Sequence, residues 1–76
     1  MAVFRTVNRV VKATYPGRDI QAVAGRGYVY FVGDDGHDTI DSIFVHPQNT
    51  STADVTRLVL EEIADAIKTG ERNEKV

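Results

Sequence analysis

The sequence predicts a single α+β domain whose elements follow the order helix, strand, strand, strand, helix. Apolar residues recur at helical spacing near both ends of the 76-residue chain. The region between them holds short runs of β-favouring residues, separated by clusters rich in glycine and aspartate. The simplest two-layer arrangement is a three-stranded antiparallel sheet with both helices packed on one face. The other face of the sheet is then expected to stay open.

The first helix is predicted over residues 2–14, because apolar side chains recur along one of its faces: Val3, Phe4, Val7, Val10 and Val11. The opposite face is predicted to be polar and mostly basic, with Arg5, Asn8, Arg9 and Lys12. Pro16 and Gly17 cannot continue a helix, so a turn is expected to follow.

Three strands are predicted, over residues 19–24, 28–32 and 39–45. Gly25 and Gly27 supply the positive φ angles that a tight hairpin needs between the first two strands. The third strand is expected to pair antiparallel after a second turn.

The two faces of this sheet differ in the residues that they are predicted to carry. Side chains alternate along a strand, which assigns Val29 and Phe31 to the core. The open face is then predicted to hold five large apolar residues: Tyr28, Tyr30, Val32, Ile40 and Phe44. An exposed apolar face of this kind is typical of an interaction surface.

The last helix is predicted to begin after a cap at Ser51 or Thr52 and to run to about Lys68, with Gly70 ending it. Its apolar stripe is Val55, Leu58, Val59, Ile63, Ala66 and Ile67. Residues 71–76 are polar and are predicted to form a frayed tail beyond a domain of residues 1–70.

Composition limits the classes of protein to consider. The chain has no cysteine, which excludes disulfides and thiolate metal sites. Its net charge is −2, divided as +4 over residues 1–30 (five basic, one acidic) and −6 over residues 31–76 (four basic, ten acidic). We find neither a signal-peptide pattern nor a stretch of about 20 apolar residues, so a soluble cytoplasmic protein is expected.

The segment Asp34-Asp35-Gly36-His37-Asp38 gathers carboxylates and an imidazole, but its residues are typical of a turn and their spacing matches no calcium loop. His46 has no companion at a ligand-like spacing. The glycines flank strands instead of opening a helix, which argues against nucleotide binding. We therefore expect no enzyme, no catalytic residue, no metal and no cofactor.

The strand Arg26-Gly27-Tyr28 with Tyr30 resembles part of the signature strand of the RNA recognition motif. That resemblance implies two tyrosines spaced to stack bases. The element order also resembles a double-stranded RNA-binding domain, but residues 50–55 lack its lysine cluster. Nucleic-acid binding is therefore kept as an alternative function, with candidate residues Arg5, Arg9, Lys12, Arg26, Tyr28 and Tyr30.

The span from Arg26 to about Ile63 contains a Gly-Tyr-aromatic strand, a short acidic turn, the segment Ser-Ile-Phe-Val and a helix capped by Thr or Ser. In this order of motifs it resembles small accessory proteins of phages, plasmids and other bacterial mobile elements. The resemblance implies a non-enzymatic protein that docks on a host macromolecule, such as an anti-defence inhibitor of the anti-CRISPR type. Candidate partner-binding residues are Tyr28, Tyr30, Phe44, Arg26, Glu61, Glu62 and Asp65. Together with Asp34, Asp35, Asp38 and Asp41, the acidic residues can imitate phosphates toward a basic partner. A homodimer through the sheet face is compatible with either function.

Overall fold

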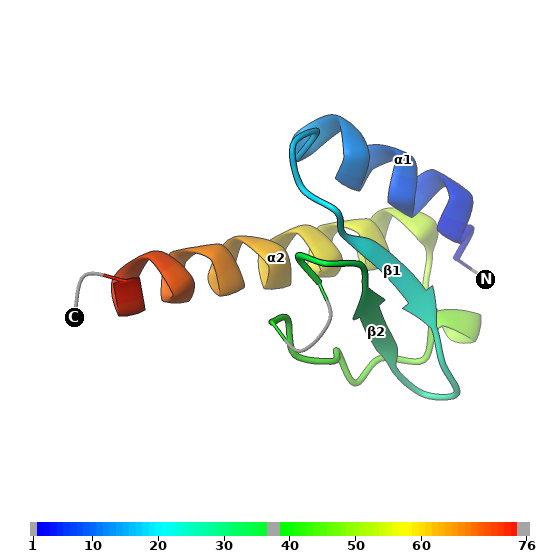
Figure 1. Ribbon diagram of the computed structural model, residues 1–76. Helices are drawn as coiled ribbons and strands as arrows, with labels where there is room; N and C mark the ends of the chain where they lie inside the picture. Colours follow the sequence, from blue (N-terminus) through cyan, green and yellow to red (C-terminus); the bar gives the residue numbers. More distant parts are fainter. Residues whose placement is uncertain (1, 37–38, 75–76) are drawn as a thin grey trace.

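The computed structural model describes residues 2–36 and 39–74 of the chain. Two helices, a two-stranded antiparallel sheet and one short 3-10 helix form a mixed α+β domain (Figure 1). The elements are α1 (Phe4–Thr14), β1 (Gln21–Ala24), β2 (Val29–Val32), η1 (Pro47–Asn49) and α2 (Thr52–Glu74). Neither helix in the described ranges is long and apolar enough to cross a lipid bilayer.

The prediction of a three-stranded sheet is wrong. Residues 39–45 meet β2 at one isolated bridge, in which Val29 and Ile43 exchange two backbone hydrogen bonds of 2.8 Å each. On either side of this bridge, backbone amides form hydrogen bonds within local turns instead of pairing with β2. The Ile40 amide donates to the Gly36 carbonyl at 3.3 Å, and the Val45 amide donates to the Ile43 carbonyl at 3.0 Å. Ile40, in the first of these turns, is buried in the core. The prediction that Ile40 lies on the open face is therefore wrong.

The hairpin of β1 and β2 has one buried and one outward face, as predicted. Its register pairs Gln21 with Val32 and Ala24 with Val29. Ala22, Val29 and Phe31 are buried on the inner face, which confirms the assignment of Val29 and Phe31 to the core. Tyr28 belongs to the connecting loop and not to the strand, because β2 begins at Val29.

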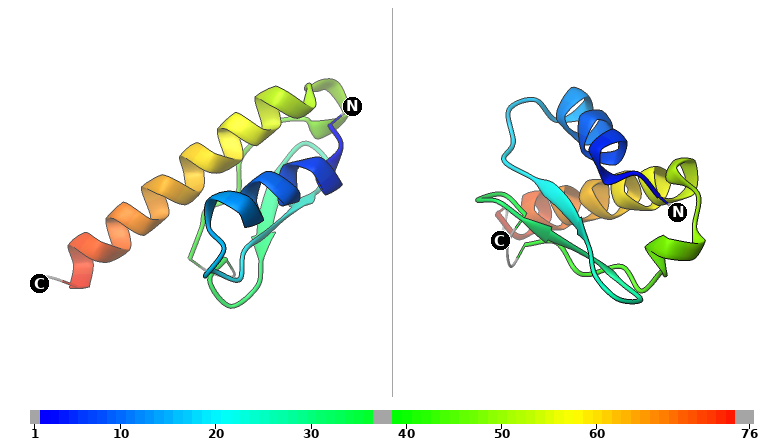
Figure 2. Two further views of the ribbon diagram at one scale, coloured as in Figure 1. Left: turned by 90° about the horizontal axis from the view of Figure 1, so that it is seen from above. Right: turned by 90° about the vertical axis from the view of Figure 1, so that its right-hand side faces the viewer.

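Both helices lie on the inner side of the hairpin (Figure 2). Valine and isoleucine side chains one helical turn apart form the centre of the core: Val7 and Val11 of α1, and Val55, Val59 and Ile63 of α2. The side-chain amide of Asn8 hydrogen-bonds to the backbone of Ala22, which attaches α1 to the outer edge of β1. The sequence predicts Asn8 on the solvent-facing side of the helix, and this prediction is wrong because its side chain is bonded to β1.

Helix α2 is capped as predicted but extends further. The Ser51 hydroxyl accepts a hydrogen bond from the Asp54 amide at 3.1 Å. The helix then continues through Gly70 to Glu74 and projects beyond the rest of the molecule (Figure 1). One glycine inside a helix costs only about 1 kcal/mol relative to alanine, which is too little to end it.

A candidate docking surface on the hairpin

The outward face of the hairpin carries two neighbouring tyrosines. Tyr30 pairs with Val23, so both point away from the buried Ala22 and Phe31 on the inner face. The rings of Tyr28 and Tyr30 lie with centroids 5.8 Å apart and planes tilted by 37°. Tyr28 is 38% exposed and Tyr30 is half-buried. Their rings thus form one continuous aromatic patch.

Phe44 adds the most exposed aromatic ring of the described residues, with 88% of its surface accessible. It follows Ile43, which is bridged to Val29 and packs against the core. The exposure of Phe44 distinguishes it from Ile43, the residue before it, which is partly buried. We call Tyr28, Tyr30 and Phe44 the aromatic surface. Of the five residues predicted for the open face, Tyr30 and Val32 lie on the outward side of β2, and the Tyr28 ring contacts Tyr30.

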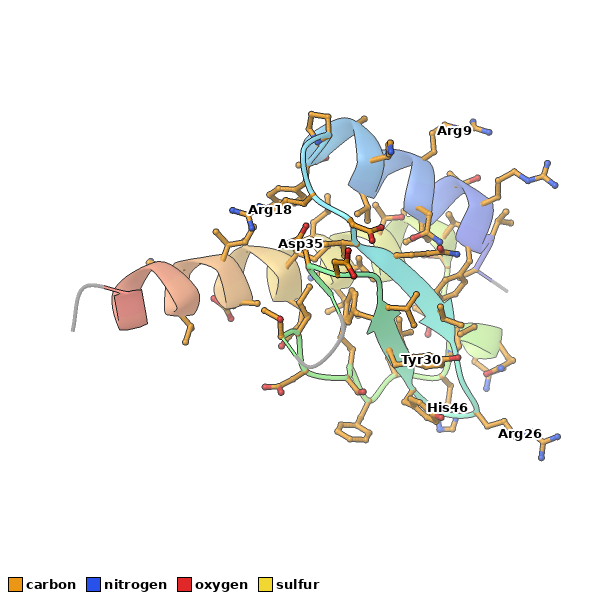
Figure 3. The ribbon with its side chains drawn as sticks, viewed as in Figure 1. Arg9, Arg18, Arg26, Tyr30, Asp35 and His46 are labelled. Atoms are coloured by element: carbon orange, nitrogen blue, oxygen red, sulfur yellow. The ribbon has the colours of Figure 1, made fainter. Side chains whose placement is uncertain are left out.

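Two glycines allow side chains to lie close against the hairpin loop. A Cβ on Gly25 would lie 2.5 Å from the Tyr28 ring, and a Cβ on Gly27 would lie 2.9 Å from the His46 ring. The φ angle of Gly27 is +76°, in the region that favours glycine. Arg26 is exposed between them and projects from the loop (Figure 3).

The basic residues predicted for nucleic-acid binding are divided between two parts of the molecule. Arg5, Arg9 and Lys12 are exposed on α1. Arg9 projects away from the hairpin, whereas Arg26 and Tyr30 lie on the hairpin itself (Figure 3). Of the labelled arginines, only Arg26 lies near the end of the hairpin that carries the aromatic rings. Arg9 therefore does not share a surface with Tyr30 (Figure 3).

The acidic residues proposed as phosphate mimics are also divided. On α2, Glu61 pairs with Arg57 at 3.3 Å, with both side chains largely exposed. Glu62 lies on another flank and shares a shallow depression of about 540 Å³ with Asp41 and Asp65. Partial burial raises the pKa of Glu62 above its ordinary value of 4.5, and the charges of Asp41 and Asp65 raise it further.

The other acidic residues stabilise the open end of the hairpin. An Asp35 carboxylate oxygen accepts a hydrogen bond from the Asp19 amide at 2.8 Å, and an Asp19 carboxylate oxygen accepts one from the Asp34 amide at 3.0 Å. These bonds agree with the prediction of a turn over this segment. His37 and Asp38 lie outside the described residues.

Sequence reasoning missed the ring of His46 beside Gly27 and the Gln48 side chain, whose amide donates to the Gly25 carbonyl at 3.4 Å. The two glycines signal close packing against this loop, but not by which residues. It also missed a largely apolar groove of about 660 Å³ between the helices, lined in part by Val10, Ala53 and Leu60. Within residues 2–36 and 39–74, no three acidic or histidine side chains are grouped to hold a metal ion.

Comparison of the chain with protein-family models, with curated proteins and with solved structures finds no match.

Proposed function

We propose that this chain is a non-enzymatic binding protein that docks on another protein through its aromatic surface. The observation that carries the proposal is Phe44, which is 88% exposed and directly follows the residue that bridges to β2. Fully burying a phenylalanine is worth about 1.5–3 kcal/mol relative to leaving it in water. Tyrosine, phenylalanine and arginine are enriched at protein interfaces, and tyrosine and arginine dominate their hot spots. Arg26 at the adjacent loop completes this composition.

The aromatic surface is favoured over the acidic residues of α2 as the main source of affinity. Arg57 already compensates the charge of Glu61. The raised pKa of Glu62 means that its environment disfavours the carboxylate. Charges at the edge of an interface mainly accelerate association and contribute less to affinity. We therefore assign Glu61, Glu62 and Asp65 a steering role toward a basic partner.

The class of partner follows from the resemblance of residues 26–63 to accessory proteins of phages and other mobile elements. We infer a cytoplasmic host complex that processes nucleic acid or defends against it, which this chain inhibits by occupying a binding surface. The separation of the basic residues between α1 and the hairpin favours docking on a protein over direct nucleic-acid binding. Direct nucleic-acid binding would need the α1 arginines and the tyrosines on one face of the molecule.

The test compares capture of host proteins by matched variants at low micromolar concentration. Immobilised wild-type protein and the control Val3→Ser, altered at a 54% exposed residue outside the aromatic surface, are expected to capture the same host protein. The variant Phe44→Ser, which alters an exposed side chain and should fold normally, is expected to lose it. Equal capture by all three proteins would contradict the proposal.

Nuclease treatment and gel shifts test the alternative. Capture is expected to survive nuclease treatment of the lysate. Micromolar binding of RNA or DNA at low salt, lost in Arg26→Gln, would instead support nucleic-acid binding.

A further inference from the structure

The hairpin carries opposite charges at its two ends. Arg26 is exposed at the loop end, and Figure 3 shows it at the far end of the hairpin from Asp35. The open end carries Asp19, Asp34 and Asp35 with the single cation Arg18. Among the described residues, neither the Arg26 guanidinium nor the Asp34 carboxylate makes a hydrogen bond or ion pair within the chain. Both charges are therefore available to a partner.

These two charges flank the strand ladder at its opposite ends. The outermost residue pairs of the ladder are Ala24 with Val29 and Gln21 with Val32. Arg26 is two residues beyond Ala24, and Asp34 is two residues beyond Val32. Between them, the outward face presents Val23, Tyr30 and Val32, all half-buried. The face is thus apolar at its centre, with a cation in the loop at one end and an anion in the turn at the other.

We propose that a second copy of this chain covers the outward face of the hairpin, as a two-fold dimer with antiparallel stacked hairpins. A two-fold axis that runs across the strands between the two faces places Arg26 of one subunit against the partner subunit's Asp34. Every contact in such an interface occurs twice, so both charge pairs form together. Parallel stacking would instead place Arg26 against the partner subunit's Arg26 and Asp34 against the partner subunit's Asp34. Repulsion between these like charges disfavours the parallel arrangement. The apolar centre is Val23, Tyr30 and Val32 of both subunits.

The dimer regulates the surface assigned under the proposed function, and in this respect the inference rests on that function. A host protein and a second copy both need Tyr30, so they compete for this face of the hairpin. Dilution below the dimer dissociation constant therefore exposes the aromatic surface. An interface of one hairpin face per subunit is small, so we expect dissociation in the range of about 10–100 µM.

Sedimentation velocity from about 5 µM to 1 mM tests the dimer on the purified full chain. Wild-type protein should move from the 8.4 kDa monomer toward twice that mass. The variants R26E and D34K should each raise the dissociation constant at least tenfold, because each opposes like charges twice. An equimolar mixture of R26E and D34K should restore association, since the mixed dimer has two opposite-charge pairs.

Matched controls separate this pairing from general charge effects. R9E and D65K make the same charge changes at exposed positions on the helices and should dimerise like wild-type protein. Circular dichroism of every variant checks that it is folded. A monomer at all concentrations, or a mixture that associates no better than its two components, would overturn the inference.

The two proposals fail in different experiments. A monomeric protein that still captures a host partner through Phe44 overturns only the dimer. A dimer with the expected charge dependence, combined with host capture that ignores Phe44, overturns only the host-docking function.

Discussion

The side-chain amide of Asn8 forms with the backbone of Ala22 the two hydrogen bonds that a neighbouring strand would form. Its nitrogen donates to the Ala22 carbonyl at 2.9 Å, and its oxygen accepts from the Ala22 amide at 2.8 Å. One residue of α1 thus satisfies the outward backbone groups of Ala22 in β1. An exposed strand edge is a template for pairing with other chains, so Asn8 also protects the protein against edge-to-edge association.

Replacing Asn8 with alanine is expected to destabilise the protein by about 1–3 kcal/mol, because a partly buried backbone amide and carbonyl lose their partners. Urea denaturation followed by circular dichroism measures the change. Lys12→Ala, an exposed position on the same helix, is the control and should remain close to wild type. If both variants unfold at the same urea concentration, the two hydrogen bonds contribute nothing measurable.

Helix α2 provides a second test, at positions that differ in burial. Ile63 is fully buried, whereas Leu58 lies half-buried on the flank of the helix. Ile63→Ala is expected to cost about 2–5 kcal/mol, a large part of the total stability of a domain of this size. Leu58→Ala should cost clearly less. Thermal melts of both variants check this order, and a greater loss from Leu58→Ala would contradict the packing described.

The hairpin loop depends on the conformation of Gly27. Its φ angle of +76° is strained for any residue with a Cβ, and that atom would also lie 2.9 Å from the His46 ring. Gly27→Ala is therefore expected to destabilise by about 1–2 kcal/mol. Gly17→Ala is the matched control, because a Cβ there would meet nothing within 4 Å. Adding His46→Ala to Gly27→Ala should recover only the steric part of the loss, as urea titrations of the three variants can show.

The surroundings of Glu62 are expected to make the stability of the protein depend on pH. Partial burial, and then repulsion by Asp41 and Asp65, raise its pKa in the folded protein above 4.5. Its contribution to stability is therefore most favourable below pH 4.5 and is lost as the pH rises through the raised pKa.

Glu62→Gln removes this penalty and is expected to raise the melting temperature slightly at neutral pH, with no gain at about pH 3.5. The effect is small because solvent screens a half-exposed group. Glu61→Gln serves as the control, since its pair with Arg57 is exposed on both sides. A gain for Glu62→Gln that persists unchanged in acid would show that charge is not the cause.

The elements that depend on local patterns could be predicted from the sequence. The valine spacing predicts α1, the Gly25 and Gly27 loop predicts the hairpin, and Ser51 predicts the start of α2. Local patterns could not show that the third strand is absent, because its absence depends on the hydrogen bond from the Ile40 amide to the Gly36 carbonyl. That bond competes with strand pairing and carries no local sequence signal.

The candidate site shows the same division. Alternation along the chain predicts the outward position of Tyr30 and the exposure of Phe44, and the structure agrees with both. It cannot predict that Asn8 turns toward β1, because this contact depends on how α1 packs against α2. It also cannot predict that Glu61 and Glu62 lie on different flanks with different neighbours.

Photo-crosslinking at Phe44 tests the central claim most directly, namely that the aromatic surface is where this protein meets a protein partner. A photo-reactive phenylalanine analogue replaces Phe44 in one protein and Val3 in a control protein, and both are irradiated in host cells. We predict a specific protein adduct from position 44 and none from position 3, with an additional adduct of twice the chain mass if the dimer forms. The absence of any adduct at position 44, or the same adducts from both positions, would contradict the account.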